Sequence, residues 1–258
     1  MPSEDDLVKR ARDLVPMLRQ NAVEAEDRRR LPDANIAALK EAGLHKYFSP
    51  ARYGGWEMDW PVQYRIGREL AKGCGSTAWV ATVVMGHGWL VGRLPQSVQD
   101  AVWGDGPDAI ITTGVAEGST LEPVSNGYRV NGTWKFCSGI DHADWVMFGG
   151  LVRELDAPKD ASPTRRVALL HRSEVSVLDN WFAAGLKGTG SGEVRVENVV
   201  GPAERTAVQM PQGGSTPGAT LHSGYIYGVE MLPYFRTALL GPILGAAQGA
   251  MNEYIDFT

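Results

Sequence analysis

A glycine-containing segment near the middle of the chain carries the first side chains whose types and spacing could do chemistry. It reads Asn131-Gly132-Thr133-Trp134-Lys135-Phe136-Cys137-Ser138-Gly139. Its first residues predict a strand of a β-hairpin, and Ser138 with Gly139 predicts a turn at the strand end. A serine hydroxyl in such a turn either caps the local backbone or offers a hydrogen bond to a ligand. From its neighbours alone, Ser138 is open to both interpretations.

A single histidine lies in a long apolar stretch, within Met85-Gly86-His87-Gly88-Trp89. A histidine on an apolar helix is more often a core residue than a catalyst. However, each flanking glycine costs about 1 kcal/mol relative to alanine in a helix interior, which indicates that another group approaches closely. An imidazole that is neutral near pH 7 can also accept a proton from a bound molecule. His87 is therefore a candidate for a core residue or for a general base.

Glycine also dominates a third segment, Gly185-Leu186-Lys187-Gly188-Thr189-Gly190-Ser191-Gly192. It lacks the Gly-Lys-Ser/Thr ending of a phosphate-binding loop, and no strand and helix flank it as a dinucleotide site requires. The segment gives no support for a nicotinamide site. It is either a turn between strands or a ligand contact through Lys187, Thr189 and Ser191.

Helices alone must position His87, because residues 1–107 are predicted to form an N-terminal helical domain. Ser3 and Asp6 make a capping-box pattern before an apolar stripe from Leu7 to Ala25. Further helices are predicted from Pro32 to Gly43, from Pro61 to Lys72, from Ser76 to Leu94 and after Pro95. The helix that begins at Ser76 is apolar on almost every face, so it should be packed on all sides.

Residues 108–220 carry β-branched and alternating residues and are predicted to form a central antiparallel β-domain or small barrel. The expected strands are Ile110–Val115, Tyr128–Phe136, Trp145–Leu151, Val167–His171 and Glu193–Val199. After a glycine- and proline-rich loop, Met210–Gly218, a last helical pattern runs from about Tyr227 to Tyr254. It lies in residues 221–258, the third predicted domain. A single apolar helix cannot bury its own surface, so we expect it to pack on further sequence or another subunit.

In this order of elements the chain resembles the acyl-CoA dehydrogenase superfamily over essentially its whole length. The resemblance rests on the helices, the strand with Trp134, Phe136 and Ser138-Gly139, and the loop from Lys187 to Ser191. It implies an α+β fold with an N-terminal helical domain, a central antiparallel β-domain and the start of a C-terminal helical bundle, most of which is absent.

Two motifs favour one branch of that superfamily. Ser138-Gly139, followed by Asp141-His142 and Asp144-Trp145, is similar to the oxygenase components of two-component flavin-dependent aromatic monooxygenases, the group D hydroxylases. Dehydrogenases usually have a Thr-Glu-Pro flavin signature with Gly-Ser-Asp, whereas this chain reads Thr112-Thr113-Gly114-Val115-Ala116-Glu117-Gly118-Ser119. An acyl-CoA dehydrogenase with bound FAD is the alternative enzyme. An oxygenase acting on nitrogen is a narrower variant, and a truncated non-catalytic relative is the alternative that is not an enzyme.

The hydroxylase resemblance implies an enzyme that receives reduced FMN or FAD from a separate NAD(P)H flavin reductase. With O2 it would form a C4a-hydroperoxyflavin and hydroxylate a phenolic or polycyclic aromatic substrate. The resemblance places Ser138 beside flavin N5 and lets His87 reach and deprotonate the substrate. The other implied flavin contacts are Thr112, Thr113, Trp134, Gly139, Lys187, Thr189 and Ser191. Glu253 is a minor candidate, because some dehydrogenases have a catalytic glutamate in this region.

Composition argues against several other classes. The formal net charge of −5 leaves no basic excess for duplex nucleic acid. Cys74 and Cys137 lack the spacing of a zinc site, so no metal is expected and both are interpreted as buried small residues. The most apolar stretch, Thr77–Val91, is shorter than the roughly 18 to 20 residues of a membrane span. The acidic start of the chain is unlike a secretory signal, so we expect a cytoplasmic location. The apolar stripe of the last helix predicts that subunits associate, and we expect a homotetramer with closed symmetry.

Overall fold

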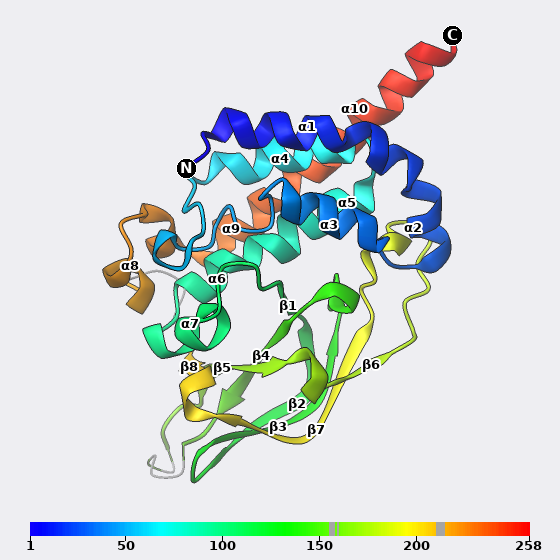
Figure 1. The fold of residues 1–258 in the computed structure, drawn as a ribbon. Coiled ribbons are helices and arrows are strands. Elements are labelled where there is room, and N and C mark those ends of the chain that lie inside the picture. The colour runs from blue at the N-terminus through cyan, green and yellow to red at the C-terminus, as the bar shows by residue number, and fades with distance from the viewer. Residues whose placement is uncertain (155–157, 159, 210–214) are drawn as a thin grey trace.

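The structure is a computed structural model that describes residues 1–154, 158, 160–209 and 215–258. Figure 1 shows a layer of helices above a β-domain. The helices are α1 (Glu4–Gln20), α2 (Ala22–Arg28), α3 (Asp33–Glu41), α4 (Pro61–Ala71), α5 (Gly75–Trp79), α6 (Gly88–Gly92), α7 (Gln96–Trp103), α8 (Pro217–Leu221), α9 (Met231–Ala238) and α10 (Leu240–Phe257). The strands are β1 (Ile111–Thr113), β2 (Val115–Val124), β3 (Gly127–Lys135), β4 (Trp145–Val152), β5 (Thr164–His171), β6 (Ser176–Leu178), β7 (Glu193–Pro202) and β8 (Thr206–Val208). The predicted α+β class is confirmed.

The first helix begins at the predicted capping box. The Asp6 N–H donates to Ser3 Oγ at 3.1 Å, and the Ser3 N–H donates to Asp6 Oδ2 at 2.9 Å. The apolar stripe is divided, however, because α1 ends before Asn21 and α2 begins after it. At this break, Asn21 Nδ2 donates to Asn35 Oδ1 at 2.7 Å, which ties the turn to α3.

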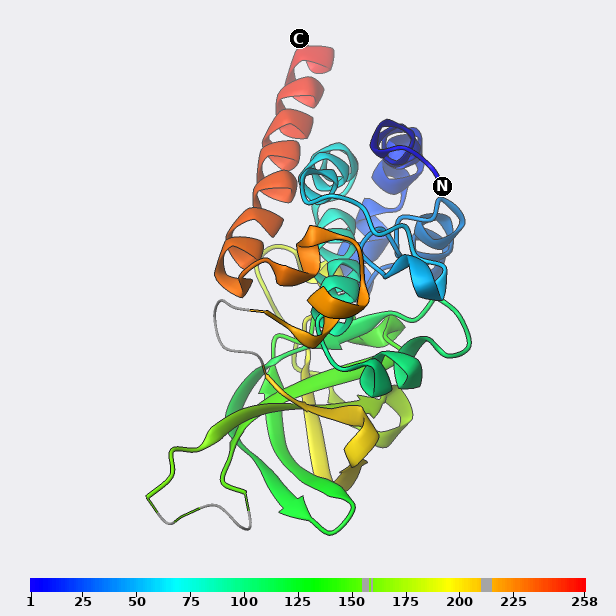
Figure 2. The ribbon, with the colours of Figure 1, turned by 90° about the vertical axis from the view of Figure 1, so that its left-hand side faces the viewer.

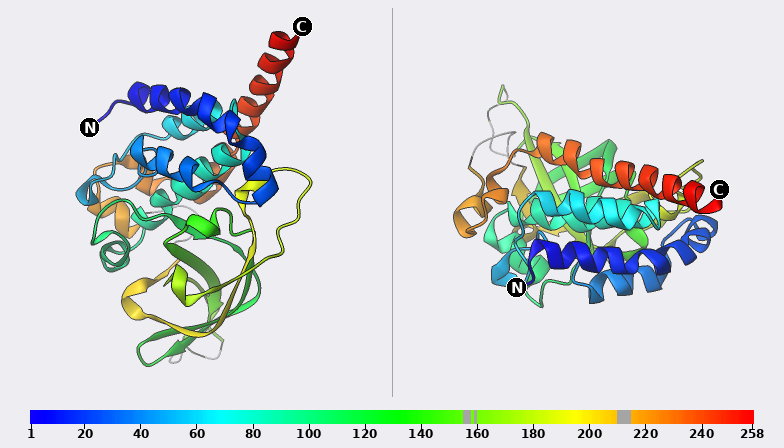
Figure 3. Two further views of the ribbon diagram at one scale, coloured as in Figure 1. Left: turned by 45° about the vertical axis from the view of Figure 1, so that its right-hand side comes forward. Right: turned by 90° about the horizontal axis from the view of Figure 1, so that it is seen from above.

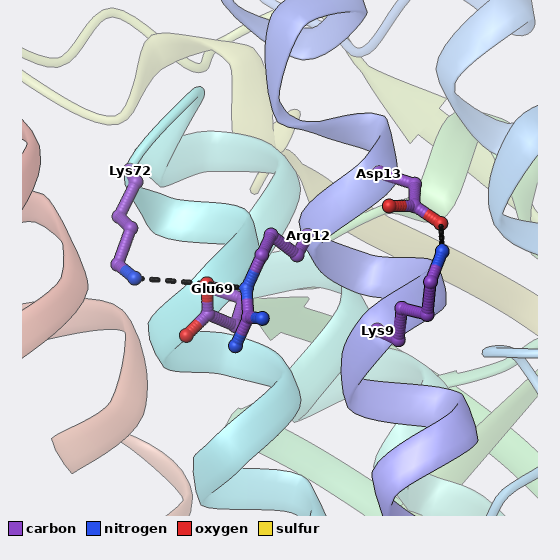
Figure 4. A network of polar contacts seen from close by, with 5 residues as sticks. All are labelled: Lys9, Arg12, Asp13, Glu69 and Lys72. Atoms are coloured by element: carbon purple, nitrogen blue, oxygen red, sulfur yellow. Dashed lines mark hydrogen bonds and ion pairs between the residues drawn. The ribbon is translucent and has the colours of Figure 1, made fainter.

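Helix α4 lies between α1 and α10, as the view from above shows (Figure 3). The Glu69 carboxylate on α4 accepts from Arg12 Nε of α1 at 3.2 Å and from Lys72 Nζ at 2.8 Å (Figure 4). Burial raises the pKa of Glu69, but the two cations outweigh this effect and hold the pKa below its ordinary value. Lys9 and Asp13, by contrast, form an exposed pair within α1.

The last helix packs one face within the chain through glycines, which the sequence analysis did not expect, while its other face keeps exposed apolar side chains. Gly241, Gly245 and Gly249 are buried, lie four residues apart and face α4. An added Cβ at Gly245 would lie only 2.2 Å from Arg68 O. The lack of side chains therefore lets the two helix backbones approach closely. Figure 2 shows the C-terminal turns of α10 extending beyond the rest of the helical layer.

Gly245→Ala is expected to lower the free energy of unfolding by about 1 to 3 kcal/mol. The added methyl group would meet the backbone of α4, and this outweighs the advantage of about 1 kcal/mol that alanine has as a helix former. Urea unfolding would measure the change. Gly185→Ala is the matched control, because an added Cβ there meets nothing within 4 Å. A Gly245→Ala variant as stable as the parent protein would contradict the close packing.

The predicted helix Ser76–Leu94 is not regular, which corrects the sequence expectation. A π-helical turn at Val80–Val84 and a 3-10 turn at Met85–His87 separate α5 from α6. Side chains from other segments donate hydrogen bonds to backbone carbonyl oxygens of this run. Gln63 Nε2 of α4, for example, donates to Thr82 O at 2.7 Å. Such competition disrupts the regular hydrogen-bond ladder, and π-turns are frequent at functional sites.

No side chain larger than that of glycine fits at Gly86, the residue before His87. An added Cβ at Gly86 would lie 2.3 Å from Tyr234 Oη and 2.5 Å from Gln63 Nε2. The close approach predicted from the glycines that flank His87 is therefore confirmed, and the approaching groups at Gly86 are core side chains.

Two four-stranded sheets form the β-domain, in the orders β1-β4-β5-β8 and β2-β3-β7-β6. Every neighbouring pair is antiparallel except β1 with β4, which is parallel. The predicted strands that correspond to β3, β4, β5 and β7 are confirmed, whereas β2, β6 and β8 were not predicted. Strand β2 contains glutamate, glycine, serine and proline and lies at a sheet edge, where the usual strand pattern is relaxed.

Candidate active site

A cavity of about 720 Å³ lies between the irregular helical run 79–94 and the β-domain. Residues 112–116, which are the end of β1, Gly114 and the start of β2, border it, as does the loop 185–191. Met231 and Phe235 of α9 also line it. The volume is in the range of small-molecule sites, and the lining is mostly apolar with a few polar side chains. The cavity is therefore suited to a largely apolar small molecule that a few hydrogen bonds orient.

Three hydroxyl groups from two distant parts of the sequence form one hydrogen-bonded chain in this cavity. Ser138 Oγ lies 2.7 Å from Ser191 Oγ, which lies 2.7 Å from Thr189 Oγ1. Thr189 Oγ1 donates to Leu186 O at 2.9 Å. All three side chains are buried and line the cavity. The structure thus brings together three of the residues that the sequence suggested as flavin contacts.

The direction of the protons in this chain follows from its ends. A carbonyl oxygen can only accept, so Thr189 donates to Leu186 and accepts from Ser191, which in turn accepts from Ser138. Trp79 Nε1 donates to Ser138 Oγ at 3.2 Å. The Ser138 hydroxyl is thus oriented by one donor and one acceptor, and its second lone pair is free to accept from a ligand.

The two predicted threonines line the cavity but direct their hydroxyl protons elsewhere. Thr112 Oγ1 donates to Ser138 O at 2.7 Å, and Thr113 Oγ1 donates to Met147 O at 2.8 Å. The segment 112–116 therefore offers a ligand mainly its backbone and methyl groups. The bond from Thr112 also holds the turn that carries Ser138 against β1.

Three predicted flavin contacts do not reach the cavity. Trp134 is fully buried in the β-domain core, with its ring centroid 4.4 Å from that of Phe148. Gly139 packs beneath the π-helical turn, where an added Cβ would lie 3.3 Å from Val80 and Val84. Lys187 lies in the loop beside the cavity, but its side chain does not line it.

Phe136 is a cavity residue that the sequence interpretation missed. Strand alternation would direct Phe136 to the same face as Trp134, but its backbone is left-handed, with φ of 59°, and turns the ring out into the cavity, 59% exposed. Leu186 has the same conformation, with φ of 54°, and also lines the cavity. Such conformations cost bulky residues about 1 to 3 kcal/mol and cluster at functional sites. The only available signal was the aromatic residue beside the Ser138 turn.

His87 lines the cavity and is almost completely buried. Its Nδ1–H donates to Ile111 O at 2.9 Å, so Nε2 carries the lone pair of the neutral ring. Nε2 has no hydrogen-bond partner among the described residues. Burial lowers the pKa of His87 to about 4, and the bond to Ile111 opposes this only in part. At neutral pH the ring is therefore an uncharged, unused proton acceptor.

Three further findings concern the described residues of the chain. Glu253 does not line the cavity; it pairs with Arg19 at 3.1 Å on the surface. Within residues 1–154, 158, 160–209 and 215–258, no group of three or more His, Cys, Asp or Glu side chains is arranged to hold a metal ion. Over the same residues, no helix has the length and apolar character needed to span a bilayer.

Comparison with known proteins agrees with this architecture. Residues 2–97 match the family model of the acyl-CoA dehydrogenase N-terminal domain. The chain is 35% identical over 245 residues to the flavin-dependent monooxygenase oxygenase subunit HsaA of Rhodococcus jostii, covering 94% of this chain and 63% of that protein. It is 30% identical over 253 residues to the FADH2-dependent resorcinol hydroxylase oxygenase component of a Rhizobium species, covering 97% of this chain and 61% of that protein. The crystal structure of HsaA from M. tuberculosis superposes with a TM-score of 0.91 at 32% identity, covering 99% of this chain and 69% of that one.

A helical layer that closes a cavity over a two-sheet β-domain thus defines the acyl-CoA dehydrogenase fold. Within that fold, the chain belongs to the family of oxygenase subunits of flavin-dependent monooxygenases. It spans 63% and 61% of the lengths of the two curated relatives compared above.

Proposed function

We propose that this chain forms the flavin-binding and substrate-binding part of an oxygenase component that hydroxylates a phenolic or polycyclic aromatic compound with reduced FMN or FAD and O2. One observation carries the proposal: a single cavity contains an oriented hydroxyl, Ser138, and a buried, unprotonated imidazole, His87, with an unused Nε2. The names of the relatives, a flavin-dependent monooxygenase subunit and a resorcinol hydroxylase component, support the same chemistry.

The residue types that line the cavity are suited to binding a flavin ring system. The backbone of residues 112–116, the exposed ring of Phe136 and the hydroxyl chain from Ser138 to Thr189 are the groups that would hold the ring system. When bound, reduced flavin supplies the two electrons with which O2 is activated. Ser138 Oγ would accept a hydrogen bond from flavin N5–H and hold this proton in place, because its own proton is directed to Ser191. Trp79 and Ser191 would keep the Ser138 hydroxyl in this orientation.

His87 would act on the substrate. Its Nε2 would accept the phenol proton, which raises the electron density at the ring carbon that is hydroxylated. Because a pKa of about 4 makes the imidazole a much weaker base than a phenolate, the proton would move to Nε2 only as oxygen transfer proceeds and would return to the product oxygen afterwards. The apolar residues Leu90, Met147 and Val167 would exclude water from the aromatic ring.

The partners are part of the same proposal. The reduced flavin would come from a separate NAD(P)H flavin reductase, and a cytoplasmic location would give that reductase its NAD(P)H. The chain would assemble into a homotetramer. The support is an exposed apolar face of α10, opposite the glycine face, formed by Leu240, Ile243, Leu244, Met251, Tyr254 and Ile255. Such a face is typical of a subunit contact.

The proposal is tested with the full-length protein, an added flavin reductase, NADH, O2 and a panel of phenols. Hydroxylated product should form only when the reductase is present, and the protein should bind reduced flavin more tightly than oxidised flavin, because the shuttled cofactor must enter reduced. Isolation with stoichiometric, tightly bound FAD that an acyl-CoA bleaches would instead identify a dehydrogenase.

A further inference from the structure

Arg93 is a cation in the cavity that has no counter-ion among the described residues. Arg93, just after α6, lines the cavity and is only 3% exposed. Its Nη1 donates to Val229 O, and its guanidinium lies 4.5 Å from the ring centroid of Trp89. No Asp or Glu of the described residues forms an ion pair with it. Burial lowers the pKa of Arg93 to about 10, so the side chain stays charged at neutral pH.

A buried charge without a partner is costly, and proteins pair such groups or use them to bind a ligand. One carbonyl bond and one aromatic ring use only part of a guanidinium with five N–H donors. The described residues that line the cavity include no carboxylate, whereas they include a second arginine, Arg165, which is exposed at the rim. The electrostatics of this cavity therefore favour a negatively charged ligand.

The position of Arg93 separates it from the flavin contacts. Trp79, which holds Ser138, and Arg93 are at opposite ends of the helical run, roughly 21 Å apart at 1.5 Å per residue. His87 lies between them, roughly 9 Å from Arg93 along the same axis. A phenol whose hydroxyl contacts His87 would thus direct a substituent toward Arg93 and away from Ser138.

We propose that Arg93 binds the carboxylate of the substrate, so that the enzyme hydroxylates an aromatic acid, a phenol that carries a carboxylate side chain. This inference rests on the proposed function and names its substrate class. The guanidinium can bind a carboxylate through two parallel hydrogen bonds, which would also fix the orientation of the ring relative to His87.

The test compares 3-(4-hydroxyphenyl)propanoate with its uncharged primary amide, by calorimetric binding to the full-length protein and by product formation with reductase present. The parent protein should bind the acid about 10- to 100-fold more tightly than the amide. Arg93→Gln should lose this preference while its affinity for the amide stays nearly constant, and Arg93→Lys should retain part of the preference. Because Arg93 also donates a hydrogen bond to Val229 O, a melting curve for each variant shows whether it folds. If Arg93→Gln does not fold, the preference for the acid is compared between the parent protein and Arg93→Lys.

Several outcomes would overturn the inference. Equal or undetectable binding of acid and amide by the parent protein would do so, as would an equal loss for both in Arg93→Gln. If Arg165→Gln removes the preference instead, the anion is bound at the rim. A lower affinity of Arg93→Gln for reduced FMN, with the acid preference intact, would assign Arg93 to the flavin phosphate. Acid binding that depends on Arg93, without any hydroxylation, would disprove the proposed function but not the carboxylate site. Hydroxylation without a preference for the acid would disprove the carboxylate site but not the proposed function.

Discussion

Replacing His87 with asparagine is expected to slow hydroxylation of the aromatic ring about 10²- to 10⁴-fold, the usual loss for a general base. Consumption of O2 by the bound reduced flavin should continue at a near-normal rate, because His87 comes from the helical part of the cavity and forms no hydrogen bond with Ser138. Asparagine can still donate to Ile111 O but cannot take up a proton. Single-turnover experiments that follow product and O2 separately would measure both effects.

The alternative for His87 is a purely structural role, and the same variant separates the two. A core histidine would leave the hydroxylation rate of the folded enzyme nearly unchanged, while its loss would lower the melting temperature through a cavity and a missing hydrogen bond. A destabilised variant with the parent hydroxylation rate would end the catalytic assignment. His171→Asn is a suitable control, because that histidine is exposed and does not line the cavity.

The pKa of His87 also determines how pH acts in this comparison. In the folded protein the pKa is lowered from 6.5 to about 4, so the imidazole remains a base down to about pH 5. The unfolded chain takes up the proton at higher pH than the folded chain. The contribution of His87 to stability is therefore fully present above about pH 6.5 and is lost as the pH falls toward 4. The free energy of unfolding, measured with urea at pH 7 and pH 5, should therefore fall less between these two pH values in His87→Asn than in the parent protein.

Replacing Ser138 with alanine is expected to leave flavin affinity within about tenfold of the parent value, because one hydrogen bond contributes about 0.5 to 1.5 kcal/mol in net terms. Coupling should suffer more. Without the Ser138 hydroxyl, nothing holds the flavin N5 proton, and Trp79 and Ser191 both lose a partner. We expect the ratio of hydroxylated product to hydrogen peroxide to fall by about tenfold, measured by product analysis and a peroxidase assay.

The control for Ser138 is Ser173→Ala, since Ser173 is a serine outside the cavity whose hydroxyl contacts His171. It should leave both flavin affinity and coupling at the parent values. An unchanged product-to-peroxide ratio in Ser138→Ala would place Ser138 in a structural role, as the residue that links Trp79 to Ser191.

Local patterns in the sequence were sufficient for a helical part followed by a β-domain, for the capping box at Ser3, for most of the strands and for the close packing around Gly86. These features depend on the periodicity of the chain and on residues only a few positions apart. The same local signals also identified His87 and Ser138 as candidates. They could not decide between a core and a catalytic role, because burial and hydrogen-bond partners come from remote segments.

Only the tertiary structure decided which side chains meet in the cavity. Ser138 and Ser191 are joined across 53 positions, and no periodic pattern predicts such a pairing. The left-handed backbone of Phe136 turns its ring into the cavity, whereas Trp134, which was expected to contact flavin, lies in the core of the β-domain. The unpaired charge of Arg93 is likewise invisible in the sequence, because an arginine at the end of a helix is usually solvated. Only the folded chain buries it, against the Trp89 ring and the Val229 carbonyl.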